Sequence, residues 1–331
     1  MTATVDSSPR LASRLVNGVL AIKPLAKLAK YQARSMMIKR AESIGVYWRQ
    51  EVQTLRSRGT EAAFSPEWEI ELAQITNPKL AYPGYYLRSF HAYEQGNLSW
   101  DAAMEVEVAA YAVHARIWDK AGAKGDRMLR QSYHDSLNQQ IATSPQAILD
   151  IGCSVGMSTF ALKTIYPDAR ITGLDLSPYF LTIAHYHSQQ GVSDQESGIK
   201  QSTRSSTSQS PIFTWIHAPA EATGLPDASF DLVSAHLIFH ELPRNAAIDI
   251  LQEARRLLRP GGHLAIMDMN PKSEIYAQMP PYILTLLKST EPYLDEYFAL
   301  DLEQAIYDAG FTRPTITCNS PRHRTVIAQV R

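Results

Sequence analysis

The stretch that decides the fold is ILDIGCSVGMST, residues 148–159. Its apolar start is typical of a buried strand that ends at Asp150, and Gly152 and Gly156 mark a tight turn before a helix that begins near Met157. Glycines in such a turn let the backbone approach a ligand closely, because no side chain stands in the way. The segment therefore predicts a strand, a ligand-binding turn and a helix.

A second acidic residue supports this prediction. Asp175 ends the next predicted strand, in ITGLDLS, residues 171–177. An acid about 20 positions after the glycine turn accepts hydrogen bonds from ribose hydroxyls in nucleotide-binding strand-helix-strand units. The nicotinamide fingerprint G-x-G-x-x-G is met only at Gly152, since Ser154 and Met157 stand at its other glycine positions, and this disfavours a dehydrogenase.

The pattern of apolar residues divides the chain near residue 142. Residues 1–142 have mostly helical periodicity and predict an N-terminal helical extension. Over residues 143–331, short apolar runs alternate with helical stretches, which predicts an α/β domain with a doubly wound, mainly parallel sheet. The predicted strands cover residues 147–150, 171–175, 212–216, 232–235, 264–267, 315–318 and 325–330. Residues 188–211 carry almost no large apolar side chain and predict a disordered insertion.

Composition limits the classes of protein to which the chain can belong. Its 331 residues give room for about two domains. With 45% hydrophobic and 20% charged residues and a net charge of −1, wholesale disorder is excluded and nothing global favours nucleic acid. The two cysteines, Cys153 and Cys318, lack metal-ligand spacing, so no metal site is predicted. No apolar run is long enough to span a membrane, which predicts a cytoplasmic protein.

Residues 10–40 are unusually basic. Residues 1–40 contain eight Lys or Arg residues but only one acid, Asp6, and apolar residues recur among them at helical intervals. This is typical of a basic amphipathic helix, split or kinked at Pro24. Two interpretations stay open: peripheral contact with an anionic membrane, or a helix packed on its own domain with a solvated basic face. An organelle transit peptide is a third alternative, disfavoured because the helical pattern continues past residue 30.

The motifs resemble those of class I S-adenosylmethionine-dependent methyltransferases, and most closely the methyltransferase type 11 and ubiquinone/menaquinone-biosynthesis members. Asp150, Gly152 and Gly156 match the first motif, Asp-x-Gly-x-Gly-x-Gly, in which Ser154 replaces the middle glycine. EATGLPDASFD (residues 221–231) resembles the adenine-side loop and fourth strand, and LLRPGG (residues 257–262) resembles the turn into the fifth strand. The resemblance implies a Rossmann-like methyltransferase fold with a seven-stranded sheet and S-adenosyl-L-methionine as the cofactor. The implied cofactor-binding residues are Asp150, Gly152, Cys153, Ser154, Gly156, Asp175, Leu176, Ala220, Glu221 and His236.

Two further regions are candidates for the acceptor side of the site. Ligands of open parallel sheets lie beyond the carboxyl ends of the strands, so the residues after the fourth predicted strand face the transferred methyl group. His240 or Glu241 is therefore the candidate general base. The alternative is that neither residue is catalytic: His240 caps the following helix, and Glu241 is a solvated acid in its first turn. The aromatic loop PGYYLRSFHAYEQGNLSW (residues 83–100) supplies the candidate substrate residues Tyr85, Tyr86, His91 and Tyr93, which otherwise simply pack the extension on the core.

The expected acceptor is a small, lipophilic or aromatic molecule. The fourth strand is followed by FHELP, residues 239–243, and not by the Asn/Asp-Pro-Pro-aromatic sequence of DNA amino-methyltransferases, which disfavours nucleic acid. A non-catalytic cofactor-binding or scaffold protein is the second class of function, because an intact cofactor motif predicts binding but not turnover. Neither the acceptor atom nor the oligomeric state follows from the sequence.

Overall fold

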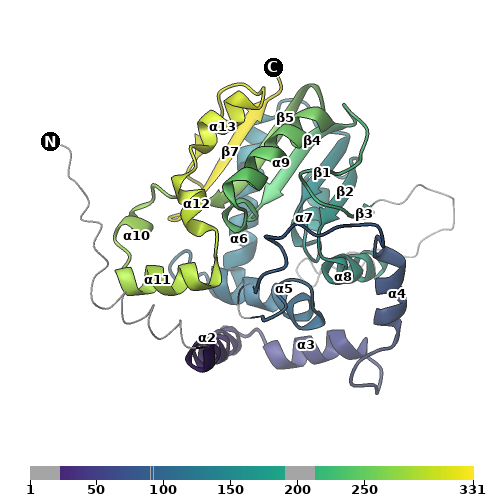
Figure 1. Cartoon of the computed structure of the whole chain (residues 1–331), viewed down its shortest axis with the longest axis vertical. Coiled ribbons are helices and arrows are strands. Elements are labelled where there is room, and N and C mark those ends of the chain that lie inside the picture. Colours follow the sequence, from purple (N-terminus) through teal and green to yellow (C-terminus); the bar gives the residue numbers. More distant parts are fainter. Residues whose placement is uncertain (1–22, 90, 92, 191–212) are drawn as a thin grey trace.

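The structure of the protein, a computed structural model, describes residues 23–89, 91, 93–190 and 213–331. It contains a seven-stranded sheet in the order β3-β2-β1-β4-β5-β7-β6 (Figure 1). The strands from β3 to β5 are parallel, whereas β7 runs antiparallel to both β5 and β6. The strands are β1 (Ala147–Ile151), β2 (Arg170–Asp175), β3 (Phe213–His217), β4 (Phe230–His236), β5 (Leu258–Met269), β6 (Thr315–Thr317) and β7 (His323–Gln329).

Helices precede the sheet and connect its strands. The N-terminal ones are α2 (Lys23–Ser43), α3 (Trp48–Ser57), α4 (Glu67–Ile75), α5 (Trp100–His114), the short η1 (Gly122–Lys124) and α6 (Gly125–Gln140). Those within the sheet region are α7 (Met157–Ile165), α8 (Pro178–Gln189), η2 (Phe239–Glu241), α9 (Arg244–Leu257), α10 (Glu274–Ala277), α11 (Pro281–Thr290), α12 (Leu294–Ala299) and α13 (Leu302–Asp308).

The sheet is covered on both faces, as its side-chain alternation requires. Successive side chains of a strand point to opposite faces, so Ile148 packs with α6 and α7 residues, whereas Leu149 packs with those of α9 and α13. Both side chains are fully buried. This two-sided burial explains why β1 is a continuous apolar run and not an alternating one.

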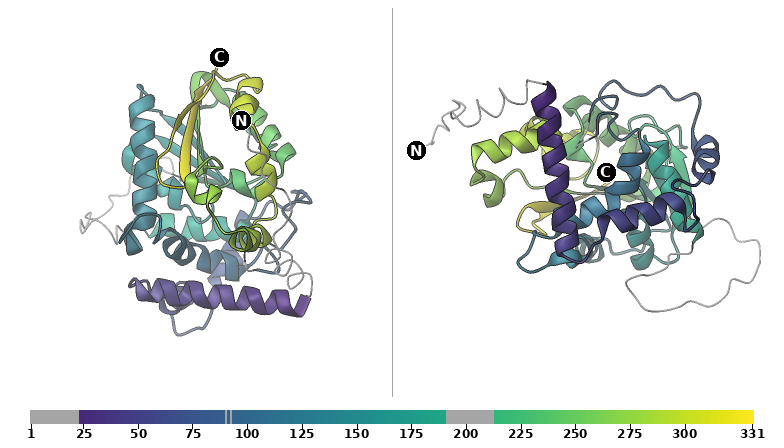
Figure 2. Two further views of the ribbon diagram at one scale, coloured as in Figure 1. Left: turned by 90° about the vertical axis from the view of Figure 1, so that its left-hand side faces the viewer. Right: turned by 90° about the horizontal axis from the view of Figure 1, so that it is seen from below.

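The N-terminal helices form a third layer at the carboxyl ends of the parallel strands. Figure 1 shows α2, α3 and α5 on that side, and the view from below in Figure 2 shows α2 and α3 crossing in front of the domain. Their apolar core, which includes Trp48, Trp68 and Met104, continues into Phe180 and Ile183 of α8. The layer is therefore packed onto the sheet domain through α8, next to the edge where ligands of parallel sheets lie.

The predicted fold is confirmed: the sheet is seven-stranded and mainly parallel, with N-terminal helices. The helix α6 lies before residue 142 in the chain but covers one face of the sheet. Of the predicted insertion, residues 188–189 end α8 and residues 191–211 lie outside the described residues.

The basic segment is described only in part. Residues 10–22 lie outside the described residues, and Pro24 falls in the first turn of α2. Arg34 donates to Glu105 Oε2 at 2.9 Å, so this base pairs within the fold. Membrane contact stays a prediction. Within the described residues, no helix has both the length and the apolar character needed to cross a bilayer.

Candidate active site

The turn between β1 and α7 is held in a strained backbone conformation. Its φ angles are +65° at Gly152, +51° at Ser154 and +88° at Gly156. A Cβ at Gly156 would lie 2.8 Å from Cε2 of Phe160, so glycine is required there on both conformational and steric grounds. Ser154 adopts the left-handed conformation at a cost of about 1–2 kcal/mol. Its backbone N–H donates to Asp175 Oδ2 at 2.8 Å, which offsets part of that cost.

Asp150 is completely buried near the end of β1, and hydrogen bonds reach only one of its two carboxylate oxygens among the described residues. Ser158 and Thr159, in the first turn of α7, donate their hydroxyls to its Oδ2 at 2.6 and 2.7 Å. Its Oδ1 has no hydrogen-bond partner among the described residues. Burial raises the pKa of Asp150 to about 6. An unpaired buried carboxylate oxygen is costly, so this atom suits a donor group of a bound ligand.

Asp175 links the turn to β2 and also meets the aromatic loop. Its Oδ1 accepts the Ser177 N–H at 2.7 Å, and its other oxygen accepts that of Ser154. Burial raises its pKa to about 6 although these hydrogen bonds oppose the shift. The Tyr86 hydroxyl lies 3.4 Å from Oδ1. Tyr86, an expected substrate residue, thus approaches the expected ribose acid.

The adenine-side residues lie next to the same aromatic loop. The Tyr85 hydroxyl donates to both carboxylate oxygens of Glu221, at 3.0 and 3.2 Å. Leu176, which follows Asp175 in the sequence, and Ala220, which precedes Glu221, are both buried. Both tyrosines therefore contact expected cofactor-binding acids.

Cys153 and His236 are buried packing residues. Cys153 lies under the turn, where its Sγ would be 2.9 Å from a Cβ placed on Gly173, and burial raises the pKa of its thiol. The His236 ring meets Tyr133 of α6 edge-on at 5.7 Å between ring centroids. Its Nε2 is buried without a partner among the described residues, and burial lowers its pKa.

Arg130 of α6 is a candidate that the sequence interpretation missed. Its side chain is only 12% exposed and its Nε donates to Asp126 Oδ2 at 2.8 Å. An Nη atom of the same guanidinium lies 3.7 Å from Sδ of Met157, the residue that directly follows the glycine turn. Its charge also lowers the pKa of Asp150, against the effect of burial. A buried cation beside the turn suits an anionic group of a ligand.

His240, after β4, is held by Asp268. Their contact, from Nδ1 to Oδ1, measures 2.7 Å, and the His240 backbone N–H lies 3.2 Å from the other oxygen of Asp268. Burial alone would lower the pKa of His240, but the charge and hydrogen bond of Asp268 raise it to about 10. The ring is therefore an imidazolium at neutral pH, and it is a poor proton acceptor.

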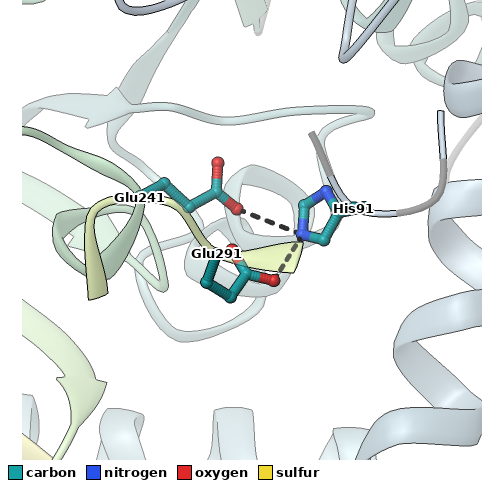
Figure 3. Close-up of side chains that lie close together, drawn as sticks. All are labelled: His91, Glu241 and Glu291. Carbon is teal, nitrogen blue, oxygen red and sulfur yellow. Dashed lines mark ion pairs between the residues drawn. The ribbon is translucent and has the colours of Figure 1, made fainter. Parts of the chain in front are cut away.

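Glu241 instead faces His91 and Glu291. Figure 3 shows both carboxylates directed at the His91 ring, whose Nε2 lies 3.3 Å from Glu291 Oε1 and 3.7 Å from Glu241 Oε1. Burial raises the pKa of both glutamates to about 7, and lowers that of His91. The residues come from the aromatic loop, from η2 and from the end of α11.

Tyr93 is the one expected substrate residue that lies elsewhere. Its hydroxyl donates to Glu105 Oε2 at 2.7 Å, in the N-terminal layer. The structure thus places Tyr85, Tyr86 and His91 of the aromatic loop against the carboxyl edge of the sheet, and Tyr93 inside the helical layer.

The comparisons with known proteins agree with this geometry. Residues 149–266 match a family model described as "Methyltransferase domain". A malonyl-[acyl-carrier protein] O-methyltransferase of Hahella chejuensis is 33% identical over 120 residues, which cover 36% of this chain and 35% of that one. The chain thus spans about a third of the length of that relative. A ubiquinone biosynthesis O-methyltransferase of Xylella fastidiosa is 27% identical over 58% of this chain and 72% of its own.

A solved structure supports the fold. A putative O-methyltransferase from Nostoc punctiforme superposes with a TM-score of 0.51 at 14% identity, covering 86% of this chain and 73% of that one. The sheet order and the family match together define an α/β domain of the methyltransferase type. Residues 149–266 thus form a methyltransferase domain of the class I S-adenosylmethionine-dependent type, for which S-adenosylmethionine is the methyl donor.

Proposed function

We propose that this protein methylates a hydroxyl oxygen of a small, lipophilic or aromatic acceptor. The observation that carries the proposal is the position of Glu241, which is half-buried in η2 just after β4 and lies 3.7 Å from the His91 ring of the aromatic loop. A carboxylate there faces the acceptor side of the cofactor pocket. The names of the Hahella and Xylella relatives, both O-methyltransferases, support oxygen as the acceptor atom.

The cofactor-binding residues divide by the part of the cofactor that each suits. The Asp175 carboxylate accepts the ribose hydroxyls, and Glu221 lies on the adenine side. The unpaired Asp150 Oδ1 suits the ammonium group of the methionine part, and the Arg130 guanidinium suits its carboxylate. The backbone at Gly156, where no side chain fits, allows the close approach.

The chain's own residues position the acceptor and remove its proton. When bound, S-adenosylmethionine supplies a methyl group on a positively charged sulfur. Glu241 accepts the hydroxyl proton as the acceptor oxygen forms its bond to the methyl carbon, and the sulfur keeps the electron pair of the broken bond. His240 stays charged on Asp268 and holds this end of the loop.

Apolar side chains of the aromatic loop and of the segments that carry Glu241 and Glu291 support a lipophilic or aromatic acceptor. Tyr85 and Tyr293 meet edge-on at 6.3 Å between ring centroids, and Ile238 is partly buried against the same core. Mostly apolar walls with a few orienting polar groups are usual for pockets that bind such molecules.

A labelled cofactor tests the function. We expect the protein, incubated with trideuteromethyl S-adenosylmethionine and separate lipid and polar extracts of its source cell, to yield a trideuteromethyl ether detected by mass spectrometry. Glu241→Gln should lower turnover about 10²-fold or more if it removes a general base. The exposed Glu274→Gln is the matched control. Cofactor binding without any methylated product would favour the scaffold alternative and refute the proposal.

A further inference from the structure

We propose that His91, Glu241 and Glu291 bind a divalent transition-metal cation that holds the acceptor oxygen. The inference deepens the proposed function and rests on it for the role of the ion, but not for its binding. Each residue offers one ligand atom, and these atoms all lie within 4.8 Å of one another. Figure 3 shows the three side chains converging.

The distances suit a shared ion better than hydrogen bonds. Bonds of about 2.1 Å to a metal place neighbouring ligand atoms roughly 3.0–3.4 Å apart. The His91 Nε2 distances of 3.3 Å to Glu291 and 3.7 Å to Glu241 lie at or slightly above that range. Hydrogen bonds from N–H to oxygen are mostly 2.7–3.2 Å long, and both distances exceed that range.

An unpaired buried atom points independently to a ligand. Glu291 is only 7% exposed, and its Oε2 has no hydrogen-bond partner among the described residues. Its Oε1 faces His91, so this carboxylate lies in the cluster with half of its acceptor capacity unused. A buried carboxylate oxygen without a donor is costly, and a bound cation removes that cost.

The His240 imidazole next to Glu241 has another partner. Its Nδ1 lies 2.7 Å from Asp268 Oδ1, so Glu241 and Glu291 are left to meet the His91 ring. Asn97 hydrogen-bonds the His91 side chain, a support that metal-binding imidazoles commonly have.

The ligand set indicates the kind of ion and its use. One imidazole and two carboxylates suit Mn²⁺ or Zn²⁺, and three protein ligands leave positions open for a substrate oxygen. Coordination lowers the pKa of a bound hydroxyl. Glu241 binds the ion through Oε1, and its second oxygen takes the hydroxyl proton. The acceptor oxygen then attacks the methyl carbon, and the carbon–sulfur electron pair stays on sulfur.

Binding of Mn²⁺ alone tests the inference without any turnover. The full-length protein, treated with a chelator and dialysed, should remove about one equivalent of Mn²⁺ per chain from the electron paramagnetic resonance signal of free Mn²⁺. Nitrogen modulation in the echo signal of the bound ion should report the His91 imidazole. Glu291→Gln should weaken binding at least tenfold, whereas the exposed Glu274→Gln should leave it unchanged.

Two results would overturn the inference: no saturable Mn²⁺ binding, or saturable binding without nitrogen modulation in the wild-type protein. The second readout needs no variant, so it stands even if Glu291→Gln fails to fold. Methyl transfer that persists in chelator-treated protein without Mn²⁺ binding would refute the metal site and leave the proposed function standing. Specific Mn²⁺ binding with no methylated product would support the metal site and refute the proposed function.

Discussion

Asp175→Asn separates the two tasks that the structure gives to one carboxylate. The carboxylate accepts backbone N–H groups from Ser154 and Ser177 at 2.8 and 2.7 Å, and it is the expected acceptor for ribose hydroxyls. An amide keeps the shape of the side chain but has a single acceptor oxygen. One of the two backbone hydrogen bonds is therefore lost, together with the charge that strengthens both.

The size of the effect follows from these contacts. A hydrogen bond to a charged group contributes about 1.5–3 kcal/mol, which corresponds to roughly a 10- to 150-fold change in an equilibrium constant. We expect titration calorimetry to show that affinity for S-adenosylmethionine and for its demethylated product falls by that factor. Thermal unfolding without ligand should show a smaller loss of stability, because the lost turn hydrogen bond is partly offset by removal of a charge whose burial raises the pKa of Asp175.

The exposed Asp168→Asn is the matched control, since it makes the same chemical change in the turn before β2. Unchanged cofactor affinity in Asp175→Asn, with the expected loss of stability, would refute the ribose assignment and leave Asp175 as a residue that only holds the turn. Equal losses in both variants would refute the reasoning altogether.

Three further outcomes are expected. Gly156→Ala should destabilise the fold by about 1–3 kcal/mol in denaturant unfolding and lower cofactor affinity, because its Cβ meets Phe160 at a φ of +88°; unchanged binding would contradict the close-approach role. Burial and the charge of Arg130 lower the pKa of His134 to about 4. Between pH 6.5 and 4 the unfolded state therefore binds more protons than the folded state, and the free energy of unfolding decreases as the pH is lowered. His134→Gln should flatten the fall by up to about 3 kcal/mol, and parallel pH profiles of both proteins would refute this. His240→Ala should lower turnover chiefly through misplacement of the loop after β4, so the pH dependence of kcat should stay that of the wild type; loss of an acid limb would instead identify His240 as the base.

The sequence predicted those features that local patterns determine. The β1 strand, the turn at Gly152 and Gly156 and the acid at Asp175 lie within one strand-helix-strand unit, where spacing alone fixes their relation. The sequence carries no such signal for the antiparallel direction of β7, because side chains alternate between the two faces in the same way in parallel and antiparallel strands.

The remaining site depends on contacts between distant segments. Arg130 lies in a helix whose buried face is formed by Leu129, Tyr133 and Leu137, and a charged residue beside an apolar stripe ordinarily faces solvent. The available signal was Asp126, one turn earlier, which pairs with it. Glu291 had no signal at all, since an acid at the end of an amphipathic helix is common on exposed surfaces.

The aromatic loop shows that the type of a residue does not determine which part of the candidate site it contacts. Tyr85 and Tyr86 were expected to form the acceptor pocket, yet their hydroxyls contact Glu221 and Asp175, whereas His91 of the same loop faces Glu241. One short segment thus contacts both the expected cofactor-binding acids and the proposed base. A ribose hydroxyl that takes Asp175 Oδ1 must share it with Tyr86 or displace that hydroxyl, and the 3.4 Å contact is long enough to be weak. Because the backbone N–H of His91 also donates to the Thr290 carbonyl, at 3.2 Å, displacement of the loop at Tyr86 would disturb the position of His91 opposite Glu291.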